Sequence, residues 1–383
     1  MTAATPLEDI RQDHLVSGIR TWVAMETPPH DKPRLVEFAE AAVHEARSLG
    51  LDAAIIPSGP EALPLVRIAA TGRTQEKPVL VLGHFDTVHP VGTLDRNRLR
   101  FEGERMFGPG TYDMKAGAYL ALRALAALHR ERAPERTIEL LLVPDEETGS
   151  TNSRDRIEAS ARNAAVALLG EPARVGGHCV TGRKGVGFIN IKARGQPSHA
   201  GLDHEKGRSA LRELAHQVLA LESMTDYDEG ITFNVGRIVG GSNRNVVPES
   251  ASLEAEFRVV SREQAEYVLR AVRALTPKID GVELEVDAFL NRPPYERTPE
   301  TVAVFERARR IAARTGFDLG EVPLTGGGSD GNFTSALGVP TLDGLGADGD
   351  GAHTLNEFIL TSTLTQRLAF WHGMLADLAW TDG

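Results

Sequence analysis

The chain has 383 residues, of which 41% are hydrophobic and 25% are charged, and its formal net charge is −11. This length exceeds the size at which one hydrophobic core usually stops growing, so we expect two domains. An acidic chain lacks the basic surface that nucleic acids require, which excludes nucleic acid as the main partner. Cys179 is the only cysteine, which excludes a disulfide framework and a thiolate zinc site.

The sequence also argues against export and membrane insertion. Residues 1–13 do not combine a basic start with an apolar run, so no secretory signal is predicted. The apolar stretch 116–128 is interrupted by Arg123, and no stretch reaches the ~20 residues that a membrane span needs. We therefore expect a cytoplasmic protein that has no membrane partner.

Helical and strand patterns alternate in the first half of the chain. Apolar residues at helical spacing predict a helix over 35–49, which ends at Gly50, and a second helix over 115–128. Short apolar runs predict buried strands over 65–70, 79–82, 138–143 and 165–169. This order is typical of an α/β fold, in which helices cover both faces of a mostly parallel sheet.

The pattern changes after residue 182. Strands are predicted over 185–193, 232–239, 251–259 and 282–289, and helices over 208–222 and 262–274. The order strand, helix, strand, strand, helix, strand indicates a small ferredoxin-like α+β unit. The strand and helix pattern seen in the first half of the chain resumes after Pro294. We therefore expect a catalytic domain formed by 1–182 and 294–383, with an inserted lid domain over 183–293.

The first chemical signal is a histidine directly after a predicted strand. The run Val79–Leu82 leads through Gly83 into His84, and Asp86 follows two residues later. In open α/β sheets, ligands bind outside the carboxyl ends of the strands, which is where His84 is expected. Asp86 is suited to hold the imidazole through its other ring nitrogen. Taken alone, His84 is better explained as a histidine that only caps a strand.

Carboxylates follow three further predicted elements. Asp113 stands in a glycine-rich turn at the head of a helix, where simple N-capping is the alternative. Asp145, Glu146 and Glu147 follow the strand 138–143, and such a cluster is costly without a cation. A solvated acidic loop is the alternative, but the hydrophobic strand that leads directly into the acids makes it less attractive. Glu171 follows the strand 165–169, and His353 lies in a glycine-rich loop near the C-terminus.

Two histidines and several carboxylates at strand ends suit zinc or a similar divalent ion. One zinc ion needs about three protein ligands, so this set is large enough for two ions that share one carboxylate. Two ions ~3.5–4 Å apart can activate a water and polarise a carbonyl together.

These motifs together resemble a known family. The segments are His84-x-Asp86, Asp113-Met-Lys-x-Gly, Glu146-Glu147-x-Gly-Ser and Glu171-Pro, with His353 near the end. In this order they look like the dizinc metallopeptidase family of glutamate carboxypeptidases, aminoacylases, acetylornithine deacetylases and succinyl-diaminopimelate desuccinylases. The run Thr-Gly-Gly-Gly-Ser-Asp over 325–330 and the run Asn-Arg-Pro-Pro over 291–294 are most similar to the bacterial glutamate carboxypeptidase branch. Each motif alone is weak, but five in register are specific.

The resemblance implies a role for each of these residues. His84 and Glu171 would hold one metal ion, Glu147 and His353 the other, and Asp113 would bridge both, with a cis peptide bond between Asp113 and Met114. Glu146 would be the general base, and Asp86 would assist the catalytic centre beside His84. Zinc is the expected metal, while cobalt and manganese stay open.

The predicted lid domain carries three further matches. His199, in Pro-Ser-His-Ala-Gly, resembles a lid histidine that stabilises the oxyanion in the active site of a partner subunit, which implies a homodimer formed through the lid. Asn245 resembles a lid residue that contacts substrate, and Arg292 resembles the arginine that grips a free carboxylate. Arg183 and Lys184 depart from the branch, and both substrate contact and plain surface charge stay open for them.

The resemblance implies a hydrolase that cuts an amide bond next to a free carboxylate. The expected reaction releases a C-terminal amino acid, with glutamate as one candidate, from an N-acyl amino acid or a peptide. The nearest alternative is an aminoacylase that removes a different acyl group by the same chemistry. A non-catalytic metal-binding scaffold is a remote alternative, since it predicts a missing ligand or base, and every position is filled here.

Overall fold

The computed structural model describes residues 7–377, which form two compact units. The first unit, here the catalytic unit, contains the chain up to Gly182 together with 297–325 and the chain from Ser329 onward. The second unit, the lid, contains Arg183–Glu296 and Gly326–Gly328. The chain thus leaves the lid after Glu296, whereas the sequence suggested a boundary after residue 293. Residues 1–6, which bear on the predicted lack of a secretory signal, lie outside the described residues.

The catalytic unit is built on a mostly parallel sheet with the strand order β1-β2-β6-β3-β7-β14. Strands β6, β3, β7 and β14 pair in parallel, while β2 runs against β6 and β1 against β2. The strands are β1 (Asp52–Ser58), β2 (Leu63–Ala70), β3 (Val79–His84), β6 (Ile138–Val143), β7 (Val166–Leu169) and β14 (Thr341–Leu342). Every residue of β3 is buried, as expected for a strand that is covered on both faces.

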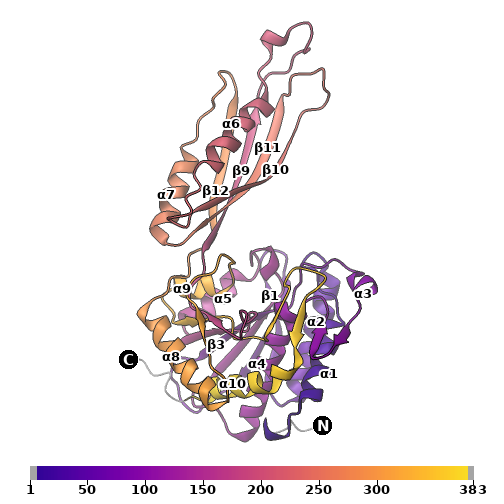
Figure 1. Ribbon diagram of the computed structural model, residues 1–383, viewed down its shortest axis with the longest axis vertical. Helices are drawn as coiled ribbons and strands as arrows, with labels where there is room; N and C mark the ends of the chain where they lie inside the picture. Colours follow the sequence, from indigo (N-terminus) through magenta and orange to yellow (C-terminus); the bar gives the residue numbers. More distant parts are fainter. Residues whose placement is uncertain (1–6, 378–383) are drawn as a thin grey trace. The chain divides into compact units, whose positions relative to one another are not determined.

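Alternate residues of β3 enter two separate cores. Val79 and Val81 pack with five helices on one face, whereas Leu80 and Leu82 pack with two helices on the other (Figure 1). The first group is α1 (Gln12–Val23), α2 (Lys32–Ser48), α4 (Ala116–Glu131), α8 (Pro299–Arg314) and α10 (Leu364–Ala376). The second group is α5 (Arg154–Arg162) and α9 (Gly331–Ala336). These layers confirm the predicted α/β architecture.

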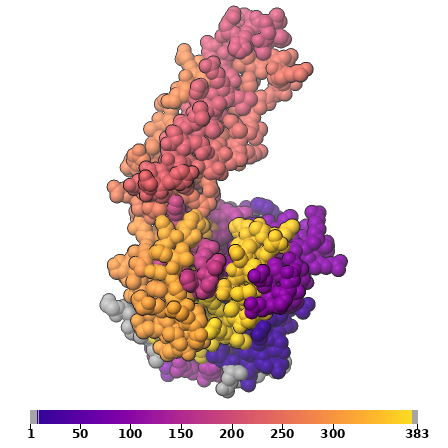
Figure 2. Space-filling model, viewed as in Figure 1, coloured from indigo at the N-terminus to yellow at the C-terminus, as the bar shows by residue number. Residues whose placement is uncertain are grey.

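The beginning and the end of the chain build this unit together. Helix α10 packs against α4 and α1, and residues late in the chain lie beside early residues on its surface (Figure 2). Two small sheets complete it, with the orders β15-β16-β5-β4 and β13-β8. Their strands are β4 (Arg100–Glu102), β5 (Arg105–Phe107), β8 (Cys179–Val180), β13 (Glu321–Val322), β15 (Gly349–Asp350) and β16 (Phe358–Leu360), and the short helix α3 is Thr93–Arg96.

The lid is an antiparallel sheet with the strand order β10-β11-β9-β12. Its elements are β9 (Gly185–Arg194), α6 (Ala210–Glu222), β10 (Thr232–Gly240), β11 (Ser250–Val259), α7 (Arg262–Arg273) and β12 (Glu283–Arg292). The two helices pack with the sheet in one core (Figure 1). This order of elements and strands is the ferredoxin-like arrangement that the sequence predicted.

Local chemistry explains where two lid elements begin and end. Helix α6 starts at Ala210 rather than at residue 208, because the Ser209 side chain accepts a hydrogen bond from the Arg212 N–H and caps the helix. Strand β12 continues past residue 289 to Arg292, with a register shift between Leu290 and Arg292. Within residues 7–377, no helix has both the length and the apolar character that crossing a membrane would require.

Candidate metal centre

Three strands bring the predicted ligands to one edge of the catalytic sheet. His84 is the last residue of β3 and pairs in register with Val143, the last residue of β6. Leu82 pairs with Leu169 at the end of β7, two residues before Glu171. Because β3, β6 and β7 are parallel, His84, the acids after β6 and Glu171 emerge at the same carboxyl edge, where open α/β sheets bind ligands.

The ligand atoms form two groups that share Asp113. The first group is His84, Asp113 and Glu171, the second is Asp113, Glu147 and His353, and within each group the donor atoms lie within 4.8 Å of one another. Asp113 Oδ1 is 3.0 Å from Nε2 of His84, and Asp113 Oδ2 is 3.3 Å from Nε2 of His353. The two oxygens of Asp113 therefore face different histidines, as a bridging carboxylate requires.

Two backbone features accompany this arrangement. The peptide bond between Asp113 and Met114 is cis, which confirms that expectation. His353 adopts a φ of 64°, in the left-handed region that histidine occupies more readily than β-branched residues. In this conformation Nε2 of His353 lies 3.1 Å from Glu147 Oε2, so the loop delivers its imidazole to the second group.

Asp86 connects His84 to the acidic segment after β6. Its carboxylate is fully buried and accepts hydrogen bonds from the backbone N–H groups of Glu146, at 3.1 Å, and Glu147, at 3.0 Å. Nδ1 of His84 lies 3.0 Å from the Asp86 backbone oxygen and 3.4 Å from its carboxylate. Asp86 thus contacts the Nδ1 side of His84, mainly through its backbone oxygen, and it also positions two neighbouring acids, which the sequence did not indicate.

Glu357 is a buried carboxylate that sequence reasoning missed. It accepts hydrogen bonds from the backbone N–H groups of Gly110, Tyr112 and Asp113, at 2.9, 2.7 and 2.8 Å. Nε2 of His89 lies 3.3 Å from the same carboxylate. Since Glu357 follows His353 in one loop, it ties the loop of one ligand to the turn of the bridging ligand. The only sequence signal was its spacing of four residues from His353.

The first of the three consecutive acids has a different role from the other two. The Asp145 carboxylate accepts hydrogen bonds from the Asn152 N–H, at 2.7 Å, and from the Ser153 hydroxyl. Burial raises the pKa of Asp145 to about 6. Asp145 therefore belongs to neither ligand group and fixes the loop that precedes α5. The acidic run is not a solvated surface loop, since Asp145 is buried and Glu146 and Glu147 are only partly exposed.

The electrostatics of the ligand groups favour bound positive charge. Burial raises the pKa of Glu147 and raises that of Glu171 well above its usual value, and the charges of Glu146 and Asp113 add to the shift at Glu171. Hydrogen bonds to Asp113 and Glu147 raise the pKa of His353 to about 10. Burial alone would lower the pKa of His84, but its contacts with Asp113 and Asp86 raise it well above its usual value.

These residues fit divalent metal ions. The raised pKa values show that the crowded carboxylates and imidazoles bind protons, which neutralise the negative charge of the site. A metal ion can displace these protons and neutralise the same charge. Imidazole nitrogen and carboxylate oxygen are ligands that zinc and related ions accept. Each group offers three protein donors, which leaves room for a further ligand as in a catalytic site.

Of the three predicted lid residues, Arg292 lies at one end of the lid sheet, and His199 and Asn245 lie at the other. Arg292 of β12 pairs with Val186 near the start of β9. His199 lies beyond Arg194 at the other end of β9, and the Ala200 N–H donates to the Asn245 backbone oxygen at 3.0 Å. The Val186–Arg194 stretch alone spans about 26 Å at ~3.3 Å per residue. Asn245 therefore belongs with His199, whereas Arg292 is far from both.

His199 is exposed, and its contacts indicate which ring nitrogen carries the proton when the ring is neutral. The backbone N–H groups of Gly201 and Leu202 both donate to its Nδ1, at 3.1 and 3.2 Å. A ring nitrogen that accepts hydrogen bonds carries no proton, so the neutral ring presents its N–H at Nε2. The imidazole is thus prepared as a hydrogen-bond donor.

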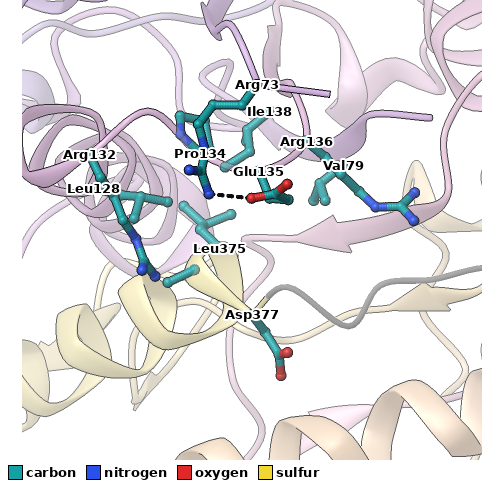
Figure 3. A pocket seen from close by; sticks show the side chains of 11 residues that line it. Arg73, Val79, Leu128, Arg132, Pro134, Glu135, Arg136, Ile138, Leu375 and Asp377 are labelled. Carbon is teal, nitrogen blue, oxygen red and sulfur yellow. Dashed lines mark hydrogen bonds and ion pairs between the residues drawn. The ribbon is translucent and has the colours of Figure 1, made fainter. Parts of the chain in front are cut away.

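A small cavity of about 10 Å³ lies near the opposite end of the same strands (Figure 3). It is lined by Val79 and Ile138, the first residues of β3 and β6, and by an ion pair between Arg73 and Glu135. This volume is about that of one water, so it cannot take a substrate. The candidate site rests instead on the two ligand groups at the carboxyl edge of the sheet.

Comparisons with known proteins agree with this site. The family model described as "Peptidase family M20/M25/M40" matches residues 80–377, which include every candidate metal ligand. The chain is 30% identical to carboxypeptidase G2 of Pseudomonas sp. (strain RS-16) over 307 residues, which cover 79% of this chain and 74% of that protein. It is 27% identical to a succinyl-diaminopimelate desuccinylase of Delftia acidovorans over 359 residues, covering 88% and 90% of the two chains.

The fold agrees as well. A solved M20 family metallo-carboxypeptidase from Sulfolobus solfataricus superposes with a TM-score of 0.77 at 18% identity, covering 95% of this chain and 99% of that one. The family match spans most of the chain, and the curated relatives are hydrolases. The chain therefore belongs to peptidase family M20/M25/M40 and is a metal-dependent hydrolase.

Proposed function

We propose that this hydrolase cuts an amide bond next to a free carboxylate and releases a C-terminal amino acid from an N-acyl amino acid or a peptide. The observation that carries the proposal is the pair of ligand groups sharing Asp113, with the additional acid Glu146 beside them. The likeness to carboxypeptidase G2 supports a carboxypeptidase, with glutamate as a candidate for the released residue.

The ligand groups suit two divalent ions. We propose zinc, with cobalt and manganese as alternatives. His84 and Glu171 would hold one ion, Glu147 and His353 the other, and Asp113 would contact both. When bound, the ions would supply polarisation of the substrate carbonyl and acidification of the attacking water.

Glu146 is the proposed general base. Its backbone N–H and that of Glu147 are both held by Asp86, so the two consecutive acids keep distinct positions. Glu147 belongs to the second ligand group, while Glu146 lies in neither group and is close enough to raise the pKa of Glu171 through its charge. Glu146 would take a proton from the attacking water and return it to the leaving amine.

His199 would serve the active site of a partner chain. Arg292, the proposed carboxylate-binding residue, and His199 are separated by most of the length of the lid sheet, so one small substrate cannot contact both within one chain. In a homodimer formed through the lid, one substrate could contact both kinds of residue. Arg292 would act in its own chain, and His199 and Asn245 would act in the partner's site. The Nε2–H of His199 would donate to the developing oxyanion.

A second candidate is an aminoacylase that removes a different acyl group. The relatives include an acetylornithine deacetylase of Myxococcus xanthus, 27% identical over 313 residues, and this likeness favours the candidate. A panel of N-acyl amino acids and dipeptides, each assayed with zinc, cobalt and manganese, separates the two by their preferred acyl groups. The cytoplasmic location stays a prediction.

Substitution of the base tests the mechanism. Glu146→Gln keeps size and hydrogen bonding but cannot accept a proton, so turnover should fall about 10²–10⁴-fold while the metal content stays near that of the wild type. Glu147→Gln is the matched control, because loss of a ligand should lower the metal content as well. A Glu146→Gln enzyme that keeps most of its turnover would show that Glu146 is not the base.

Metal analysis tests the ligand assignment. Protein reconstituted with zinc should approach two ions per chain, and His84→Ala and His353→Ala should each lower that content, since each removes one donor from a different group. His44→Ala, on α2 and outside both groups, serves as the control. If His84→Ala and His353→Ala both left metal content and activity unchanged, the site would lie elsewhere.

A further inference from the structure

Arg292 stands in a row of side chains at one end of the lid sheet. Val186 of β9 pairs with Arg258 of β11 on one side and with Arg292 of β12 on the other. Residues paired across neighbouring strands point to the same face of a sheet. Arg258, Val186 and Arg292 therefore line up on one face, with the aliphatic residue between the two guanidinium groups.

The glycine segment Gly326–Gly328 lies against this row. Arg258 Nη1 donates to the Gly326 backbone oxygen at 2.8 Å, which fixes one end of the segment. At the other end, a Cβ atom on Gly328 would meet Arg292 Cδ at 2.8 Å and Val186 Cγ2 at 3.2 Å. The stem of Arg292 thus packs directly on the Gly328 backbone, and a methyl group at Gly328 would have to displace the Arg292 side chain.

Arg183 holds the same segment from the strand end. Its Nη1 donates to the backbone oxygens of Gly327, at 3.1 Å, and Gly328, at 3.4 Å. Its own backbone exchanges two hydrogen bonds with Tyr295, at 2.9 and 3.0 Å, three residues after Arg292. Arg183 is therefore fixed to the chain that carries Arg292 and, through its side chain, to the glycines that Arg292 packs against.

These contacts decide what the sequence left open for Arg183. The residue is only 2% exposed, so Arg183 is not plain surface charge. Lys184 likewise donates to a backbone oxygen, that of Gly230, at 2.6 Å. Arg258, by contrast, forms a two-point ion pair with Glu256, with both contacts at 3.1 Å, so its charge is balanced within the lid.

We infer that Arg183 and Gly328 are positioning residues that set the guanidinium of Arg292 for the substrate carboxylate. Arg183 keeps the glycine segment in place, and the bare backbone of Gly328 limits the positions open to the Arg292 side chain. A bidentate arginine contact depends on such fixed geometry. This inference rests on the proposed role of Arg292 in carboxylate binding.

The test compares an N-acyl amino acid with the same compound carrying a C-terminal amide. The measured quantity is the preference for the acid, taken as the ratio of the two kcat/KM values. Gly328→Ala and Arg183→Gln should each lower this preference about 10- to 100-fold, as expected when a hydrogen bond to a charged group is lost. The change should lie mainly in KM for the acid, since the carboxylate is bound alike in ground state and transition state.

Two further variants make the result decisive. Gly326→Ala is the matched control, because no atom lies within 4 Å of its added Cβ, and it should keep the wild-type preference. Arg292→Ala is the reference and should lower the preference at least as much as Gly328→Ala. If Arg292→Ala has no effect, the proposed role of Arg292 fails, and the inference fails with it.

If Arg292→Ala lowers the preference but Gly328→Ala and Arg183→Gln do not, the inference is overturned and the proposed function stands. A loss in Gly326→Ala equal to that in Gly328→Ala would also overturn it, because the effect would then belong to any alanine in the segment. Should Gly328→Ala fail to fold, as judged by thermal unfolding, the preference of Arg183→Gln decides the outcome alone.

Discussion

A single carboxylate, that of Glu357, accepts three backbone hydrogen bonds from the turn that carries Asp113. Glu357→Gln keeps the size of the side chain but removes its charge, and its amide has one acceptor oxygen in place of two. We expect a loss of about 1–3 kcal/mol in the free energy of unfolding, as for buried donors that lose a charged partner. Urea unfolding of the metal-free protein measures this loss.

The same substitution should weaken metal binding, because the Asp113 turn would no longer be fixed. Competition with a chelator followed by metal analysis measures the affinity. The control is Glu40→Gln, an exposed glutamate on α2 in the same unit, which should change neither quantity. If Glu357→Gln binds metal as tightly as the Glu40→Gln variant, Glu357 supports only the fold.

The residues of the centre differ in how far sequence predicts them. His84, Glu147 and Glu171 follow buried strands, and parallel strands bring their carboxyl ends to one edge, so their proximity follows from the pattern. Glu357 escaped prediction because its partners are backbone N–H groups, which leave no signature in side-chain composition. Asp145 was grouped with its neighbours because sequence does not show which of three adjacent acids turns inward.

At the scale of elements, helix α4 packs so closely on the end of β7 that a methyl group has no room. A Cβ atom on Gly117 of α4 would lie 1.9 Å from the Gly170 backbone oxygen and 3.0 Å from Gly346 Cα. Gly117→Ala should therefore push α4 away from Gly170 and displace Glu171, the next residue. We expect a loss of about 1–3 kcal/mol in stability and a lower metal content.

Urea unfolding and metal analysis check this prediction, with Gly326→Ala as a control whose added methyl group meets no neighbour. A Gly117→Ala protein with wild-type stability and metal content would mean that the helix and the strand end can separate without moving the ligand.

Most elements were predictable because the apolar residues of each recur with the spacing of either a helix or a strand. The central strand β6 has the predicted bounds and is apolar except for Glu139, and the lid strands β9 and β11 alternate between buried and more exposed residues. Strand β1, by contrast, was missed. It lies at the edge of the sheet, contains Pro57, and has no continuous buried stretch, so its sequence lacks the pattern of a core strand.

At the scale of the whole molecule, the proposed dimer predicts complementation between two inactive chains. His199→Ala should lower turnover about 10²–10³-fold with little loss of metal, as for other oxyanion donors. In a mixed dimer of Glu146→Gln and His199→Ala chains, one site would lack both groups and the other would keep both. Activity should therefore reappear when the two variants exchange subunits.

Differently tagged chains, captured through one tag and probed for the other, show whether exchange has occurred. The control mixes Glu146→Gln with a Glu146→Gln, His199→Ala double variant, which leaves no intact site in any dimer. If tagged chains exchange and activity stays absent in the first mixture, His199 serves its own chain or does not take part in the reaction.

The separation of Arg292 and His199 along β9 has a consequence for dilute enzyme. If each site needs the far end of another chain's lid, a lone chain has an intact metal centre but no oxyanion donor. Turnover per chain should then fall as the enzyme is diluted below the dissociation constant of the dimer, and the rate should approach a second-order dependence on protein concentration. The length of one strand would thus make the activity of the enzyme depend on its own abundance.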